Sequence, residues 1–371
     1  MITAVLHMAG AVAWWFAVHR AGMPHPKLIA AAAAMTLALA FGPIVLETFP
    51  DRPRSRWRVR LVELPYLTHW CALVPALLVL PVAGAVWTVQ QVLHSVAPIS
   101  IGAWAWRAYG AGLIASFWGV FARRHMVRVR HFTARIAGLH SALAGFKIVQ
   151  LSDLHIGTYT SSQAARGWVR RANALGADLV VVTGDLVSGG AGFHREIADV
   201  LAELRAPEGV AVIPGNHEYF GDGETLFGML TARGVRVLRN QSFVVRRGAA
   251  RLNVVGVDDV WTRRANVAGA MANTERGSPT VLLAHDPALF PRAAERGADL
   301  VLSGHTHGGQ IAIPFLARWL NLSAWAHRYQ LGVYHEGGST LVVSAGLGTT
   351  GPPIRLGVAP ELVVVELRPG G

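Results

Sequence analysis

The chain has 371 residues, of which 52% are hydrophobic and 15% charged, and its formal net charge is +12. Its single cysteine, Cys71, excludes a fold held together by disulfides within the chain. Residues 1–135 hold 13 Lys and Arg against 3 Asp and Glu, a net of +10, whereas the remaining 21 against 19 give +2. The second part is therefore not expected to carry a basic nucleic-acid-binding surface, and no nucleic-acid partner is expected.

The first 135 residues are predicted to form an α-helical membrane bundle. Four apolar segments, at about 2–18, 28–46, 70–89 and 99–121, each have about the length that a helix needs to cross a hydrocarbon core of roughly 30 Å. The first segment lacks the basic stretch of a signal peptide, so it is expected to stay as an uncleaved span. Arg107 lies inside the fourth segment, and we expect its side chain to reach the nearer membrane surface.

The arginines of this part predict its orientation. Ten arginines lie in two loops, residues 52–60 and 123–135, on the same side of the predicted bundle. The loops on the other side hold only Arg20 and Lys27. The positive-inside rule then places both loops in the cytoplasm, together with a catalytic domain over 136–371. The same arginines are expected to contact anionic membrane lipids. The sequence thus indicates an integral protein of a bacterial inner membrane with a cytoplasmic catalytic domain.

Residues 136–371 are predicted to form one α/β domain. Short apolar runs bounded by Gly, Pro or Asp are typical of buried strands, and segments with helical spacing, 161–175 and 194–204, lie between some of them. Strands that alternate with helices indicate a layered α/β core. The predicted strands are residues 146–152, 178–183, 209–214, 279–284 and 299–303.

Each predicted strand is followed by a patch of carboxylate, imidazole or amide side chains. Because the carboxyl ends of strands in such sheets gather ligands, the patches are expected to meet at one rim. Carboxylates and imidazoles without thiolates suit a pair of divalent metals about 3.5–4 Å apart that promote phosphoryl displacement. Asp185 is the candidate to bridge the two metals, Asn216 offers a neutral oxygen, and His217 is a candidate proton donor. The patches are Asp153-Leu154-His155, Gly184-Asp185, Gly215-Asn216-His217-Glu218, His285 and Gly304-His305-Thr306-His307.

This ordered set resembles the calcineurin-like metallophosphoesterases, over about Lys147 to Leu367. The extension Gly308-Gly309-Gln310 and the tail beginning at Gly346 are similar to the membrane-associated bacterial branch. The resemblance implies a layered β-sandwich flanked by helices and a phosphodiesterase or pyrophosphatase that uses two divalent ions such as Mn, Fe or Zn. It implies that Asp153, His155, Asp185 and His307 hold one metal, that Asp185, Asn216, His285 and His305 hold the second, and that Asp185 and His217 serve catalysis.

The sequence departs from the protein phosphatases of this superfamily in two places. Leu186, Val187 and Ser188 follow the Gly-Asp motif where those enzymes have an arginine, so a phosphate clamp is absent there. Glu218 replaces an aspartate, and we expect it to orient His217. Arg355, in the tail near the presumed rim, is expected to be a surface arginine rather than to touch substrate.

The expected substrate is a lipid phosphodiester or pyrophosphate at the membrane surface, because some members of this branch are similar to UDP-2,3-diacylglucosamine pyrophosphatases. Residues 314–322 form either a lip that dips into the bilayer or an ordinary packed loop. Two alternatives remain open: a cyclic-nucleotide or nucleotide phosphodiesterase, and a non-catalytic metal-binding membrane sensor. A transporter is disfavoured, because no chain of acidic residues runs through the predicted spans.

Overall fold

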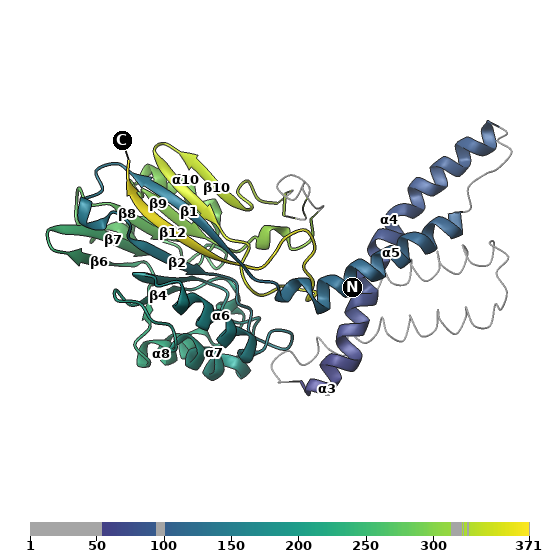
Figure 1. Cartoon of the computed structure of the whole chain (residues 1–371), viewed down its shortest axis with the longest axis horizontal. Coiled ribbons are helices and arrows are strands. Elements are labelled where there is room, and N and C mark those ends of the chain that lie inside the picture. The colour runs from purple at the N-terminus through teal and green to yellow at the C-terminus, as the bar shows by residue number, and fades with distance from the viewer. Residues whose placement is uncertain (1–53, 94–100, 313–320, 322, 325, 371) are drawn as a thin grey trace. The chain divides into compact units, whose positions relative to one another are not determined.

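The computed structural model describes residues 54–93, 101–312, 321, 323–324 and 326–370 of a chain that divides into two compact units, Met1–Ala122 and Arg123–Gly371 (Figure 1). The predicted spans at 2–18 and 28–46 lie outside the described residues, as does nearly all of the segment 314–322.

The described part of the first unit is helical. Helix α3 (Arg56–Arg58) continues through a π-helical stretch into α4 (Leu64–Val92), and α5 (Ile101–Phe121) packs beside α4. Gly112 permits this close packing, because a Cβ there would lie 2.8 Å from the carbonyl oxygen of Ala72. The predicted segments 70–89 and 99–121 thus coincide with helices. However, among the described residues no helix combines the length and the apolar sequence that crossing a membrane requires.

The second unit contains two six-stranded mixed sheets, which confirms the predicted α/β sandwich. The first sheet has the order β1-β12-β2-β3-β4-β5, with β1 (Arg128–Ile136), β2 (Lys147–Leu151), β3 (Leu179–Thr183), β4 (Val210–Ile213), β5 (Arg236–Val237) and β12 (Glu361–Pro369). The second has the order β10-β11-β9-β8-β7-β6, with β6 (Gln241–Arg247), β7 (Ala250–Gly256), β8 (Thr280–Leu283), β9 (Leu300–Ser303), β10 (Gly332–Glu336) and β11 (Ser339–Val343).

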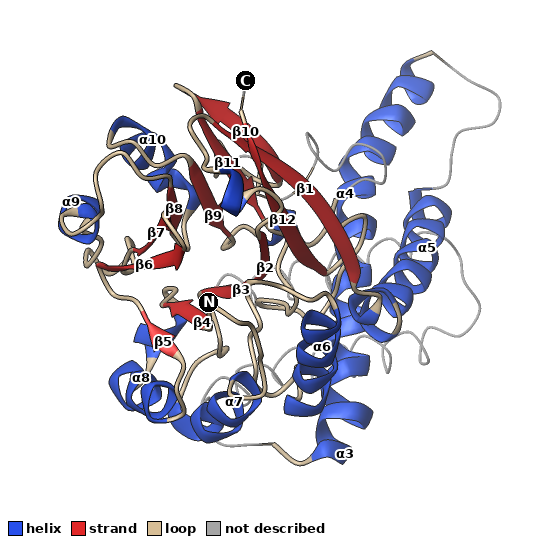
Figure 2. Ribbon diagram, turned by 60° about the vertical axis from the view of Figure 1, so that its left-hand side comes forward, coloured by secondary structure: helices blue, strands red, loops and turns tan. Residues whose placement is uncertain are grey.

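Side chains that alternate along the strands build the layers. On β2, Ile148 packs in the core between the two sheets, whereas Val149 packs on the outer face. The outer face of the first sheet carries α6 (Ser162–Ala174), α7 (His194–Leu201) and α8 (Gly223–Ala232), and α9 (Val267–Met271) and α10 (Phe290–Glu295) cover the second sheet (Figure 2). Strands buried on two faces are largely apolar, and this explains the apolar runs in the sequence.

The boundary between the units differs from the sequence-based boundary at residue 135. Strand β1 runs parallel to β12 over its whole length, from Arg128 opposite Glu361 to Ile136 opposite Pro369, inside the second unit. In the sequence, the arginines of β1 resemble the basic loop that sets the orientation of a membrane protein. In the structure, Arg128, Arg130 and Arg135 lie exposed on an edge strand, where charge discourages aggregation. Residues 123–371 therefore hold 26 Lys and Arg against 19 Asp and Glu, a net of +7 rather than a near-neutral charge.

Candidate metal centre

Loops that follow five strands converge at one end of the two sheets. Strands β2, β3 and β4 are parallel to one another, as are β8 and β9, so their carboxyl ends bring their following loops together. Asp153 and His155 follow β2, Asp185 follows β3, Asn216 and His217 follow β4, His285 follows β8, and His305 and His307 follow β9. The structure thus brings the predicted site residues to one place.

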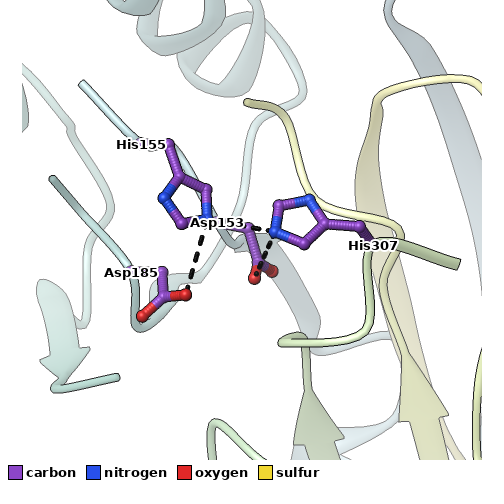
Figure 3. A group of neighbouring side chains, drawn as sticks. All are labelled: Asp153, His155, Asp185 and His307. Atoms are coloured by element: carbon purple, nitrogen blue, oxygen red, sulfur yellow. Dashed lines mark hydrogen bonds and ion pairs between the residues drawn. The ribbon is translucent and has the colours of Figure 1, made fainter. Parts of the chain in front are cut away.

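Four of these residues form a first group, Asp153, His155, Asp185 and His307, all buried (Figure 3). One potential ligand atom from each lies within 4.8 Å of those of the others. The Nε2 atoms of His155 and His307 are 3.0 Å apart, His155 Nε2 is 3.4 Å from Asp185 Oδ2, and His307 Nε2 is 3.5 Å from Asp153 Oδ1.

A second group shares Asp185 with the first and adds His285 and His305. His285 Nε2 lies 3.2 Å from Asp185 Oδ2 and 3.2 Å from His305 Nδ1. Asn216 is 7% exposed, and its buried Oδ1 has no hydrogen-bond partner among the described residues. A buried amide oxygen without a partner costs free energy unless a cation or water satisfies it, and it is therefore suited to join the second group.

The donor set fits two divalent cations. Imidazole nitrogens 3.0 Å apart can share one proton at most, and so many acceptor atoms facing one another need positive charge between them. The residues themselves show this need. Burial alone would lower the pKa of His285, but the charge of Asp185 and the hydrogen bond to it raise that pKa to about 10. Burial opposes ionisation of Asp185, yet the charge and hydrogen bond of His285, with His155 and His217, hold the Asp185 pKa well below its usual range.

The backbone bends sharply at the candidate ligands. Left-handed φ angles are unusual for residues other than glycine, cost roughly 1–3 kcal/mol each, and gather at functional sites. Eight such residues occur in the described chain, and five of them are candidate ligands: Asp153 (φ 52°), His155 (46°), Asp185 (54°), His305 (69°) and His307 (53°). These turns aim side chains from separate loops at a common point.

Glu218 has a different role from the one expected. Its carboxylate accepts hydrogen bonds from the backbone N–H groups of Gly215, Asp185 and Leu186 at 2.7–3.0 Å and from Val187 at 3.3 Å. The prediction that Glu218 orients His217 is wrong, because Glu218 instead ties the loop after β3 to the loop after β4. Burial, and then the charge of Asp185, raise the pKa of Glu218 to about 7.

His217 is oriented by a backbone carbonyl. Its Nδ1 lies 2.8 Å from the carbonyl oxygen of Ser188, which can only accept, so Nδ1 carries the proton of that hydrogen bond. Its Nε2 faces the centre, 3.9 Å from Asp185 Oδ2, and the side chain is 18% exposed. His217 therefore presents a solvent-accessible nitrogen at the edge of the two groups, as a proton donor requires.

Arg355 is fully buried rather than at the surface. Its Nη2 donates to the carbonyl oxygens of Ala345 (2.7 Å) and Gly348 (2.6 Å), and it lies 3.3 Å from His307 Nδ1. Burial lowers the pKa of Arg355 to about 10, which still leaves it charged at neutral pH. The expectation of a surface role is wrong, because the segment 345–348 folds over the guanidinium.

Three residues at the centre were missed in the sequence: Phe220, Trp261 and Asp286. The ring of Phe220 lies 4.8 Å from that of His217, and the ring of Trp261 lies 5.6 Å from that of His305. Asp286 accepts a hydrogen bond from Trp261 Nε1 at 3.2 Å and lies 3.9 Å from His305 Nε2. Two sequence features could have indicated them: Asp286 directly follows His285, and Trp261 comes soon after a pair of aspartates that ends an apolar run.

The chain is similar to a protein family and to several of its members. The profile of a family described as "Calcineurin-like phosphoesterase" matches residues 146–309. The chain is similar to "Uncharacterized metallophosphoesterase YkuE" of Bacillus subtilis (strain 168), with 30% identity over 249 residues, 66% of this chain and 86% of the relative. It is also similar to "Transmembrane protein with metallophosphoesterase domain" of Bos taurus, with 33% identity over 62% of this chain, but it spans only 54% of that relative. Among solved structures, an archaeal phosphodiesterase matches 54% of this chain and 84% of its own, with 14% identity and a TM-score of 0.31.

Proposed function

The chain belongs to the calcineurin-like phosphoesterase family, and from this premise we propose that it hydrolyses a phosphodiester or pyrophosphate bond of a lipid-linked or membrane-proximal substrate. It is a metal-dependent phosphoesterase with a buried Asp/His site for two metals. A UDP-2,3-diacylglucosamine pyrophosphatase-like activity is one form of the proposal.

The sharing of Asp185 between the two groups carries the proposal. Asp153, His155, Asp185 and His307 would hold one ion, and Asp185, Asn216, His285 and His305 the other. Divalent ions bound there would polarise the phosphoryl group. His217 holds its Nε2 at the open side of this centre, where it can protonate the leaving oxygen, while Ser188 fixes the ring through Nδ1.

The membrane part of the proposal is supported by the first unit. Large apolar side chains stay exposed along the helix pair, including Leu78 and Val82 of α4 and Ile114 and Phe117 of α5. Exposed apolar surface of this extent is typical of helices that contact lipid or another protein. The bovine relative is described as a transmembrane protein. We propose that this unit anchors the chain in a membrane with the catalytic unit on the cytoplasmic side, where the exposed Arg56 and Arg60 meet anionic lipids.

The first experiment measures hydrolysis of bis-p-nitrophenyl phosphate by the purified full chain with added Mn²⁺, beside Asp185→Asn and Asp199→Asn. Asp199 pairs with Arg233 at the surface and is the matched control. We expect turnover that requires metal, falls at least about a hundredfold in Asp185→Asn, and is unchanged in Asp199→Asn. Equal turnover in the two variants would contradict the proposed site.

A second comparison separates the substrate classes. The net charge of +7 on residues 123–371 removes the charge-based argument against nucleotide substrates. Hydrolysis of a diacylated nucleotide-sugar and of its deacylated form, at equal concentration in lipid vesicles, is therefore compared with that of a cyclic nucleotide. We expect the acylated substrate to react fastest, and faster turnover of the cyclic nucleotide would favour the alternative.

A further inference from the structure

Exposed apolar side chains are rare on the second unit and gather at the metal centre. Among its described residues, three large apolar side chains are exposed: Met126 (49%), Phe220 (62%) and Trp261 (63%). Two of the three, Phe220 and Trp261, lie against histidines of the centre. Exposing a large apolar ring to water costs free energy, so their position calls for an occupant that covers them.

Phe220 lies beside the first metal group. It ends the short 3-10 helix that begins at His217, and its ring meets that of His217 edge to face at 4.8 Å. The His217 ring in turn lies 4.5 Å from the ring of His155, a member of the first group. Phe220 thus lies beside the ring of His217, whose Nε2 faces the metal groups.

Trp261 lies beside the second metal group. Its ring is 5.6 Å from the ring of His305, whose side chain is 11% exposed. The indole Nε1 donates to Asp286 Oδ2 at 3.2 Å, so the ring is held in place although most of it is exposed. A fixed, exposed indole is pre-organised to bind a ligand, because little side-chain entropy remains to be lost.

The two aromatic side chains therefore lie beside His217 and His305, two partly exposed histidines of the centre, with side chains 18% and 11% exposed. We propose that Phe220 and Trp261 form an aromatic rim that binds an apolar group esterified to the reacting phosphate. The inference rests on the proposed phosphoesterase function and narrows its substrate class to phosphates with an apolar or flat substituent. An acyl chain and a nucleobase share this chemistry, because each offers an apolar face to an aromatic ring.

The test measures binding by calorimetry to the full chain in lipid nanodiscs with Mn²⁺, using phenylphosphonate, hexylphosphonate and methylphosphonate. Hydrolysis of the p-nitrophenyl esters of phenyl- and methylphosphonate gives the ratio of kcat/KM in parallel. The variants are Phe220→Ala, Trp261→Ala and the conservative Trp261→Phe. The control is Met126→Ala, which removes the third exposed apolar side chain, one that is not part of the proposed rim.

We expect the full chain to bind phenylphosphonate about tenfold more tightly than methylphosphonate. This preference falls severalfold in each alanine variant, is largely retained in Trp261→Phe and is unchanged in Met126→Ala. Hexylphosphonate that binds as well as phenylphosphonate supports a rim for acyl chains, and a preference for the phenyl ring alone supports a rim for a flat base.

Equal affinity for phenyl- and methylphosphonate would contradict the proposal that Phe220 and Trp261 bind the apolar substituent. So would a preference for phenylphosphonate that survives in Phe220→Ala and Trp261→Ala. These outcomes are distinct from a failure of the proposed function, in which neither p-nitrophenyl ester is hydrolysed in the presence of metal.

Discussion

At the scale of single residues, the guanidinium of Arg355 stabilises the segment that closes over the centre. It donates to the carbonyl oxygens of Ala345, Gly346 and Gly348, all in a buried environment. Replacing it with Met leaves these acceptors unsatisfied, so we expect Arg355→Met to lower the free energy of unfolding by about 3 kcal/mol in urea denaturation. Arg368→Met is the control, because Arg368 is 52% exposed and only pairs with Glu366. Equal stability of the two variants would show that the buried hydrogen bonds contribute little.

Gly304 is required because two side chains occupy the space of a Cβ. A Cβ at this position would overlap Ser152 Oγ and Asp153 Oδ2. We therefore expect Gly304→Ala to displace Asp153 and to weaken Mn²⁺ binding at least about tenfold in calorimetric titration. Gly228→Ala is the matched control: nothing lies within 4 Å of its Cβ, and it sits in α8. That variant should keep its metal affinity and gain roughly 0.5–1 kcal/mol in stability, because alanine favours the helix.

The candidate ligands could be predicted from the sequence, whereas their supporting residues could not. Asp153, Asp185 and His285 each follow an apolar run, so the end of a strand determines their position in the fold. Recognising that position needs no knowledge of distant contacts. The role of Glu218 depends on which loop lies beside it, and the nearest backbone partners of its carboxylate include residues 31–33 positions away. The burial of Arg355 was not predicted either, although the carbonyl oxygens that it contacts lie only 7–10 positions before it in the chain.

At the scale of elements, all five strands predicted from the sequence are interior strands, whereas the edge strands and the interior strands β7, β11 and β12 are not among those predicted. Strands β2, β3, β4, β8 and β9 lie in sheet interiors between apolar layers, so their sequences are mostly apolar, and the buried Gln150 of β2 is hydrogen-bonded to Thr183 and Ser303. Strand β1 is an edge with exposed arginines, and its partner β12 begins more than two hundred residues later. Neither periodicity nor local composition reveals such a pairing.

Metal removal is expected to loosen the loops and leave the strands intact. The loops after β2, β3 and β9 hold six non-glycine residues at left-handed φ angles, five of them candidate ligands, and bound ions would compensate for this cost. After chelation, amide hydrogen exchange should therefore rise at least about tenfold in residues 153–157, 184–188 and 305–310. The amides of β3 and α8 are the internal control and should change little. Uniform acceleration across the unit would show instead that the ions stabilise the whole fold.

Metal binding by the same loops is expected to release protons. In the metal-free protein His285 has its pKa raised to about 10, so its Nε2 is protonated at neutral pH and a cation must displace that proton. Mn²⁺ affinity should therefore increase with pH up to about 10, by up to about tenfold per unit for each proton released. Calorimetry in two buffers of different ionisation enthalpy gives the number of protons. His285→Asn should release fewer protons than the wild-type chain, and an unchanged number would contradict this origin.

At the scale of the whole molecule, the division between units determines which fragment can fold. Strand β1 lies on the catalytic side of the boundary, and Ala134 and Ile136 pack into the core between the sheets. Its removal would expose one edge of β12, whose residues Glu361–Val365 are all buried. An uncovered edge with apolar side chains pairs readily with other chains.

A fragment that begins at residue 123 is therefore expected to fold, and one that begins at residue 137 is not. The shorter fragment loses the parallel pairing along β12 and the ion pair of Arg130 with Glu361, while every candidate metal ligand remains present. We expect the 123–371 fragment to unfold cooperatively and to bind Mn²⁺, and the 137–371 fragment to aggregate, as judged by near-ultraviolet circular dichroism and size-exclusion chromatography. If the shorter fragment were monomeric and bound Mn²⁺ equally well, the catalytic unit would not need β1 to fold. The arginines of β1 would then be counted with the charge of the first unit.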